Sequence, residues 1–194
     1  MVEISKETKG GTGMTAAHSE LDIGCGSAKV SGAIGVDKVG TEDVDVLADV
    51  EKGLPFRDDA FEKVYMNSVL EHMDDIFKVM DEVHRVLGEK GEVIIRVPCF
   101  SHFHALTHPQ HRHAFHHESL NCLTSRSKEP YTQKRFVIKR NDYIFKSRLL
   151  GKIFNRFKHF YCSTILCYLF PADEILYVLE KEENSHSRQK ETNP

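Results

Sequence analysis

The stretch that decides the fold is LDIGCG, residues 21–26, in which an apolar strand runs directly into two glycines. Gly24 and Gly26 let the backbone turn tightly, and they let a ligand approach the main chain without meeting a side chain. A Gly-x-Gly pair alone is weak evidence, and the third glycine of a dinucleotide-binding fingerprint is missing near Ala28 and Lys29. The acidic residues around the turn therefore decide how it is interpreted.

Three aspartates fall at the ends of three successive predicted strands. The strands are predicted at residues 19–23, 33–37 and 44–49. Asp22 lies near the end of the first, and Asp37 and Asp49 end the other two. Open α/β sheets bind ligands at this edge. A carboxylate after the second strand can accept hydrogen bonds from both ribose hydroxyls, and one after the third can accept from an adenine amino group. Aspartates also end strands simply because they favour turns. Turn formation explains three acids in register beside a glycine turn less well than ligand binding does.

Strands and helices alternate through the first hundred residues. Further strands are predicted at residues 61–67, 92–97 and 175–179. Residues 75–87 are the clearest helix, because apolar residues recur on one face. Asp74 or Asp75 is expected to cap its start, and Gly88 is expected to end it in a left-handed conformation. This order predicts an α/β fold with a doubly wound, mostly parallel sheet.

Composition limits the classes of protein that remain. A chain of 194 residues with 40% hydrophobic and 28% charged residues fits one globular domain. No run of about 18 apolar residues occurs, which argues against a membrane span. Five cysteines, with no CxxC pair and no secretory signal, favour reduced thiols in the cytoplasm. We expect a flexible segment at 1–18, the domain at 19–181 and a disordered tail at 182–194.

Several longer motifs carry a family resemblance. They are LDIGCG (21–26), GVD (35–37), LADVEKGLPFRDDAFEKVYMNSVLEH (47–72) and EVHRVLGEKGEVIIRVP (82–98), with weaker matches in HPQHRHAFHHESL (108–120) and FPADEILYVLEK (170–181). With these motifs the sequence resembles the class I S-adenosylmethionine-dependent methyltransferases of the small type 11 group. The resemblance implies a Rossmann-like fold and S-adenosylmethionine as the cofactor, and it is nearly silent about the acceptor.

The resemblance also assigns residues to the methionine end of the cofactor. Gly24 and Gly26 would face its amino acid portion, Asp22 would organise its ammonium group, and Asn67 would add main-chain contacts.

At the nucleoside end, the resemblance gives the ribose to Asp37 and the adenine to Asp49 with the Val50 amide. One departure from the family pattern lies beside this end. Only 15 positions separate Asp22 from Asp37, so the first crossover helix is expected to shrink to about one turn.

Seven histidines follow the fifth predicted strand: His102, His104, His108, His111, His113, His116 and His117. They could ligate a metal, through His104 and His108 at i, i+4 spacing with the His111-x-His113 pair. They could also act as acids and bases, or hydrogen-bond a substrate from a lid segment of about 99–170. The resemblance favours the last two, because family members carry a Pro-x-His element here. Methyl transfer requires no metal, and none is predicted.

Three histidines are the catalytic candidates. His111 comes first, with His108 beside it in the same element. His72 follows Glu71 directly after the fourth strand, where the family's Glu-His pair packs or hydrogen-bonds beneath the site. For His72 a positioning role is favoured over that of a general base.

Charge is concentrated in the last third of the chain. Residues 134–158 hold nine Lys/Arg against Asp142 alone, while the net charge of the whole chain is −3. Within them, residues 146–161 form an amphipathic basic stretch that either covers the substrate side of the sheet or contacts a membrane surface. A small-molecule or phosphate-bearing acceptor would suit this charge, and nucleic acid is not indicated.

Together these features predict a methyltransferase that moves a methyl group to an O, N or C atom of an unidentified, anionic or neutral acceptor. The alternative is a non-catalytic module on the same fold that binds S-adenosylmethionine or a partner. A nicotinamide oxidoreductase is disfavoured by the missing third glycine and by Asp22.

Overall fold

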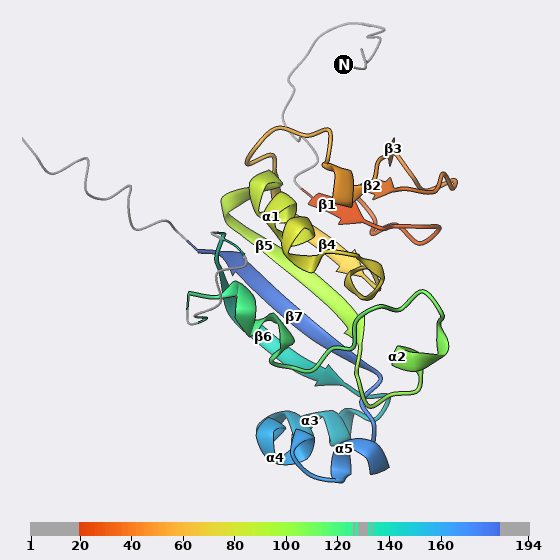
Figure 1. The fold of residues 1–194 in the computed structure, drawn as a ribbon, viewed down its shortest axis with the longest axis vertical. Coiled ribbons are helices and arrows are strands. Elements are labelled where there is room, and N and C mark those ends of the chain that lie inside the picture. Colours follow the sequence, from red (N-terminus) through yellow and green to blue (C-terminus); the bar gives the residue numbers. More distant parts are fainter. Residues whose placement is uncertain (1–19, 126, 128–131, 133, 183–194) are drawn as a thin grey trace, which may run out of the picture.

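The protein is described by a computed structural model that covers residues 20–125, 127, 132 and 134–182. The predicted flexible segment at 1–18 and all but the first residue of the predicted tail lie outside these residues. Seven strands form one sheet in the order β3-β2-β1-β4-β5-β7-β6 (Figure 1). Their bounds are β1 Glu20–Ile23, β2 Ile34–Asp37, β3 Val46–Leu47, β4 Phe61–Asn67, β5 Leu87–Pro98, β6 Phe136–Ile144 and β7 Glu174–Lys181.

The sheet is parallel from β3 through β5, and β7 is antiparallel to both of its neighbours. This confirms the predicted doubly wound, mostly parallel sheet. The α-helices are α1 Ile76–Val86, α2 His104–Thr107, α3 Arg148–Arg156, α4 Lys158–Cys162 and α5 Leu166–Leu169, and three 3-10 turns are η1 Val50–Lys52, η2 Leu70–His72 and η3 Ser119–Leu123.

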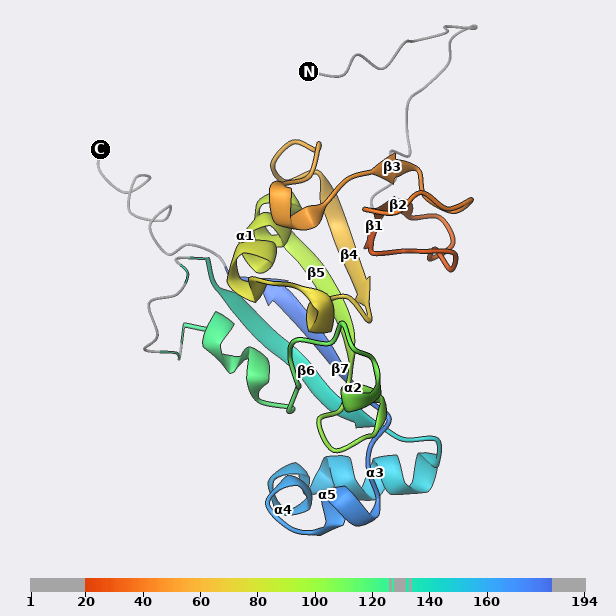
Figure 2. The same ribbon diagram turned by 45° about the vertical axis from the view of Figure 1, so that its right-hand side comes forward.

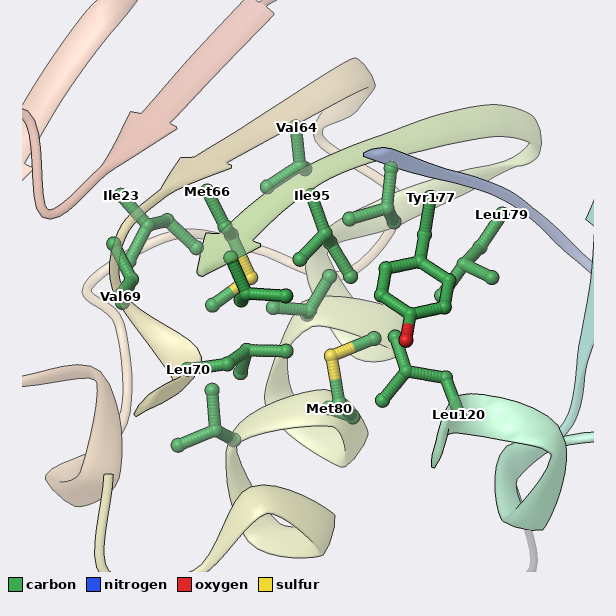
Figure 3. Packing of buried hydrophobic residues seen from close by; sticks show 14 of the residues in the cluster. Ile23, Val64, Met66, Val69, Leu70, Met80, Ile95, Leu120, Tyr177 and Leu179 are labelled. Carbon is green, nitrogen blue, oxygen red and sulfur yellow. The ribbon is translucent and has the colours of Figure 1, made fainter. Parts of the chain in front are cut away.

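The core lies between the sheet and helix α1. Val79, Met80 and Val83 of α1 are fully buried, and Met80 lies beside Leu120 and Tyr177 in Figure 3. Burial of each such side chain stabilises the fold by about 1.5–3 kcal/mol. Asp75 caps the helix as predicted, because its side chain accepts a hydrogen bond from the Lys78 amide at 3.1 Å.

The predicted glycine stop of α1 is wrong. Gly88 is not among the glycines with a positive φ, and the helix passes directly into β5 at Leu87, whose backbone is extended. The first residues of β5 thus leave the helix and pair with Phe61 of β4. Extended pairing ends the helix here, so no left-handed residue is needed.

The first crossover differs from the expected single helical turn. Residues 24–33, all of them described, contain turns and no helix. The next connection, from β2 to β3, is also a loop, and β3 itself is two residues long instead of the predicted six. The half of the sheet around β1–β3 is therefore built almost entirely from loops and short strands (Figures 1 and 2).

Strand β6 is an element that the sequence did not predict. Lys139, Arg140 and Asp142 interrupt its apolar residues, and its register against β7 shifts between Ile138 and Arg140. Such a bulge breaks the alternation by which a strand is recognised. The helices α3, α4 and α5 follow β6 and lie together at one end of the molecule (Figures 1 and 2). Among the described residues, no helix is long and apolar enough to span a membrane.

Candidate functional site at the carboxyl ends of the strands

The glycine turn after β1 needs glycine at its first position. Gly24 has φ +69°, and a Cβ there would lie 2.5 Å from Cγ2 of Val69. Gly26 also has a positive φ, +52°, but a Cβ there would meet nothing within 4 Å. Gly24 is therefore required by conformation and packing together, whereas Gly26 leaves open space beside the turn.

The three predicted carboxylates meet at one edge, because β1, β2 and β3 are parallel neighbours. Asp22 is buried, and its Oδ2 accepts a hydrogen bond from the Val30 amide at 2.8 Å. Burial raises the pKa of the Asp22 carboxyl, and the Val30 amide and Lys29 offset part of that rise. Asp22 thus holds the loop that replaces the first helix.

Asp37 ties the second strand to the glycine turn. Its Oδ2 accepts from the Gly26 amide at 3.0 Å and its Oδ1 from the Val39 amide at 2.9 Å. A carboxylate offers about four acceptor positions, so both oxygens can still accept from ribose hydroxyls.

Asp49 caps η1, with its Oδ1 accepting from the Glu51 amide at 3.1 Å. The neighbouring Lys52 ammonium, 3.1 Å from Oδ2, is the main cause of the lowered pKa of Asp49. Val50 is buried at the start of the same turn, so its backbone lies beside the carboxylate that the resemblance pairs with it.

Asn67 ends β4, and the residue after it has an unusual backbone. Ser68 has φ +55°, which is uncommon for a residue with a side chain and is frequent at functional sites. Its amide donates to the Arg96 carbonyl at 2.8 Å. No sequence signal marked Ser68, since the conformation is set by the chain leaving the sheet.

A cavity of about 460 Å³ lies at the carboxyl ends of β4 and β5. We call it the acceptor cavity; it is lined by Ser68, Glu71, Pro98, His104, Thr107, His108, His111, Lys146, Asp173 and Glu174. His108 and His111 were predicted. Lys146, Asp173 and Glu174 were not, because they come from the ends of β6 and β7. A larger cavity of about 630 Å³ lies beside η3 and β6, away from this edge, and contains none of the predicted site residues.

Glu71 is the most unusual residue of the acceptor cavity. Its side chain is buried, and among the described residues neither carboxylate oxygen has a well-formed hydrogen bond. Burial raises the pKa of Glu71 to about 7, and its own backbone amide and the Ser68 side chain oppose that rise. A buried carboxyl without a well-formed hydrogen bond is costly for the fold, so a ligand that supplies a hydrogen-bond donor would relieve it.

The backbone of Glu71 also holds the histidine-rich segment against η2. Its carbonyl accepts from the Arg112 amide at 2.7 Å and the His113 amide at 3.3 Å. The His113 ring lies 2.9 Å from the Met73 carbonyl through Nε2. His113 therefore docks the segment and does not reach the cavity lining.

The three catalytic candidates come together. The ring centroid of His72 lies 4.7 Å from that of His111 and 5.3 Å from that of His108, and His108 and His111 are 5.1 Å apart. Backbone carbonyls fix two of the rings, since Nδ1 of His72 faces Gln110 at 3.3 Å and Nδ1 of His111 faces Ala105 at 3.2 Å. Burial lowers the pKa of His72, which favours the neutral ring.

The same three histidines could hold a metal ion, since one nitrogen from each lies within 4.8 Å of the others. This grouping differs from the sequence alternative, because His104 and His113 belong to no such group among the described residues. His117 belongs to two other such groups, one with His116 and Cys162 and one with Glu118 and His159, and its buried Nδ1 lies 2.9 Å from the Tyr143 hydroxyl.

Comparison with known proteins finds a family model and solved structures that resemble this chain. Residues 33–95 match the family model described as a methyltransferase domain. No curated protein matches the chain by sequence.

Solved structures share the fold of this chain. The YcgJ protein from Bacillus subtilis is 21% identical, with a TM-score of 0.55 over 86% of this chain and 93% of that one. A SAM-dependent methyltransferase from Archaeoglobus fulgidus is 19% identical, with a TM-score of 0.55 over 84% of this chain and 85% of that one. A complex of the Haloferax volcanii Trm112 methyltransferase activator with a putative methyltransferase is also similar. It shows 16% sequence identity and a TM-score of 0.55, with 84% of this chain and 82% of that one covered.

The family match and these neighbours support S-adenosylmethionine as the cofactor.

Proposed function

We propose that this methyltransferase moves the methyl group of S-adenosylmethionine to an O, N or C atom of an acceptor held in the acceptor cavity. One observation carries the proposal: the glycine turn, the three carboxylates and the acceptor cavity share one edge of the sheet. In the transfer, the acceptor atom bonds to the methyl carbon while the carbon–sulfur bond breaks with its electron pair left on sulfur. S-adenosylhomocysteine results, and the proton of the acceptor leaves to a nearby base or to water.

The protein's main tasks are alignment and removal of water, because the sulfonium is already activated. Asp22, Gly24 and Gly26 would hold the methionine end, with main-chain contacts from Asn67. Asp37 would hold the ribose, and Asp49 with the Val50 amide would hold the adenine.

His108 and His111 would contact the acceptor directly, since both line the acceptor cavity. A neutral imidazole there can accept a proton or a hydrogen bond from the reacting group. His72 would act as a positioning residue, packed against both rings. The segment 99–170 would cover the acceptor.

The reacting end of the acceptor would carry a hydroxyl or amino group. Glu71 has two buried oxygens in need of a donor, and Asp173 and Glu174 add two more acids to the lining. Among the described residues that line the cavity, Lys146 is the only Lys or Arg. These charges disfavour a strongly anionic reacting end. Most of the basic excess of residues 134–158 lies outside the cavity lining.

Isothermal titration with S-adenosylhomocysteine tests the proposal. Wild type should bind at micromolar concentrations. Asp37→Asn should bind about ten- to a hundredfold more weakly, since a charged hydrogen-bond acceptor contributes about 1.5–3 kcal/mol. The matched control is Asp45→Asn, because Asp45 also holds a backbone amide, that of Gly35 at 2.7 Å, but is not assigned to the cofactor. No binding at sub-millimolar concentrations, or equal losses in the two variants, would refute the cofactor site.

A non-catalytic module that binds the cofactor or a partner protein is the second candidate. Its support is the loop-built cofactor half, which lacks crossover helices, and the neighbour that is a complex with an activator. Cofactor binding without turnover on a broad panel of hydroxyl and amino acceptors, together with a stable partner in pull-downs, would favour it.

A further inference from the structure

The helices after β6 expose an unusual amount of apolar surface. Eight of the thirteen exposed large hydrophobic residues among the described residues lie between positions 149 and 170. We call them the outer patch: Leu149, Ile153, Phe157, Phe160, Ile165, Tyr168, Leu169 and Phe170. Single exposed apolar residues are ordinary, but such a concentration marks an interaction surface.

The outer patch arises because this segment is apolar on two sides. Phe154 and Tyr161 face inward, with ring centroids 4.6 Å apart, and Tyr161 is fully buried. Leu149, Ile153 and Phe157 follow at i, i+4 and i+8 on another side, and Phe157 is 60% exposed. The core uses only the first side. Within the described residues, the second side is covered by no apolar group of the core, and the Arg156 guanidinium lies over the Phe157 ring at 5.7 Å.

The charge around the outer patch is of one sign. Residues 146–170 hold five Lys/Arg and no Asp or Glu, so the segment carries +5. Lys158 pairs with Asp142 at 2.7 Å, whereas no ion pair among the described residues involves Arg148, Lys152 or Arg156. Short helices that combine exposed Phe and Leu with unpaired Lys and Arg are typical of segments that lie on anionic lipid.

The segment that carries the outer patch begins and ends beside the acceptor cavity. Lys146 and Asp173, which line the cavity, flank the segment that forms α3–α5 on either side. Tyr168 of the outer patch contacts the Phe100 ring, just after β5, at 6.1 Å. A surface that settles on the outer patch would therefore reach the mouth of the cavity.

From these observations we propose that the outer patch docks on an anionic lipid surface. We further infer that the acceptor is an amphiphile whose polar end enters the acceptor cavity from that surface. The second inference rests on the proposed methyl transfer, whereas the docking does not.

Two other occupants fit the surface less well. In a dimer formed through the outer patch, two segments of +5 would face each other and repel. An acidic protein would match the charge, but it would have to cover the Phe and Leu side chains with its own apolar surface. A bilayer provides the anionic headgroups and the apolar interior together.

Vesicle flotation tests the docking with the full chain and without cofactor. Wild type should float with vesicles of phosphatidylcholine and phosphatidylglycerol, float poorly with phosphatidylcholine alone, and release as salt rises. Phe157→Ser with Phe160→Ser should weaken binding at least tenfold, and Lys152→Glu should remove the preference for anionic lipid. The matched controls are Val137→Ser, an exposed apolar residue on β6, and Lys90→Glu, an exposed lysine of β5; both should bind like wild type.

Circular dichroism and S-adenosylhomocysteine titration show that each variant is folded. Equal binding to both vesicles, no binding to either, or equal losses in the controls would overturn the docking. The docking would also be overturned if wild type formed a dimer that the patch variants dissociate, or if it bound an acidic protein and no lipid. Failure of wild type to bind S-adenosylhomocysteine while it still floats would refute the proposed function and leave the docking intact.

The amphiphilic acceptor is tested by transfer assays with matched hydroxyl acceptors that carry a long acyl chain or none. In anionic vesicles, wild type should show a higher kcat/KM for the acylated acceptor than for the other one. The double variant Phe157→Ser with Phe160→Ser should lose this difference. Equal rates for both acceptors in wild type would overturn this part alone.

Discussion

The two halves of the sheet are stabilised in different ways. Around β1–β3, the strands have four, four and two residues, and carboxylates hold the backbone: Asp22 binds the Val30 amide and Asp37 the Gly26 and Val39 amides. Around β5–β7, the strands have twelve, nine and eight residues, and aromatic rings fill the space beneath them. The cofactor half is thus held by polar contacts that a ligand can join, and the acceptor half by apolar packing that a ligand leaves alone.

The largest expected effect comes from the packing of the acceptor half. Tyr161 is fully buried against Phe154, Tyr143 and Phe145, and its hydroxyl donates to the Phe170 carbonyl at 2.9 Å. Tyr161→Ala should lower the free energy of unfolding by about 3–5 kcal/mol, measured by urea titration. The hydroxyl also accepts from the Ala172 amide at 3.0 Å, so Tyr161→Phe removes two hydrogen bonds and should lose about 2 kcal/mol. Similar losses in both variants would mean that the hydroxyl, and not ring packing, stabilises this half.

Glu71 lies where the two halves meet, and its protonation should make stability depend on pH. Its pKa is raised to about 7 from an ordinary 4.5, so between these values the native state binds more protons than the unfolded chain. The contribution of Glu71 to stability should therefore fall as pH rises from about 4.5 through 7, by up to about 3 kcal/mol.

Glu71→Gln should remove that fall and be more stable than wild type at pH 8, whereas the exposed Glu89→Gln should keep the wild-type profile. Urea titrations at several pH values measure this. If the free energy of unfolding changed with pH equally in wild type and Glu71→Gln, the energetic cost of burying the carboxylate would be offset by other contacts.

The glycine turn should be sensitive to a single methyl group. Gly24→Ala would place a Cβ on a left-handed backbone, 2.5 Å from Val69. The free energy of unfolding should therefore fall by about 2–3 kcal/mol. Gly26→Ala has open space for its Cβ and should lose about 1 kcal/mol.

Chemical denaturation gives both values, and titration of S-adenosylhomocysteine should show the weaker affinity for Gly24→Ala. Equal destabilisation by the two changes would show that Val69 moves aside without loss.

The smallest expected effect is at the cap of η1. Asp49→Ala removes one capping hydrogen bond and should lower the free energy of unfolding by about 1 kcal/mol. If Asp49 also contacts adenine, Asp49→Ala should bind S-adenosylhomocysteine several-fold more weakly than Glu51→Ala does. Glu51→Ala is the matched control, because the neighbouring Glu51 side chain accepts from the Asp74 amide. Equal affinities would remove Asp49 from the cofactor site.

The residues of the cofactor half could be read from the chain because its chemistry is local. A glycine turn follows a strand within six residues, and Asp22, Asp37 and Asp49 each lie at a strand end that parallel pairing brings to one edge. Helix α1 and strand β4 were likewise predictable, since a buried face leaves a regular apolar period. The short β3 was overestimated, because Asp45 turns back to accept from the Gly35 amide instead of extending the ladder.

The acceptor half was decided by tertiary structure. Glu71, Lys146, Asp173 and Glu174 come from distant parts of the chain, and no spacing in the sequence links them. The choice of inward face in α3 is similar: two apolar sides compete, and only the Tyr161 ring packing selects one. Sequence thus determined the turn and its acids, where neighbours along the chain are neighbours in space. Burial of Glu71 and exposure of Phe157 depend on what folds over them, which a local pattern does not contain.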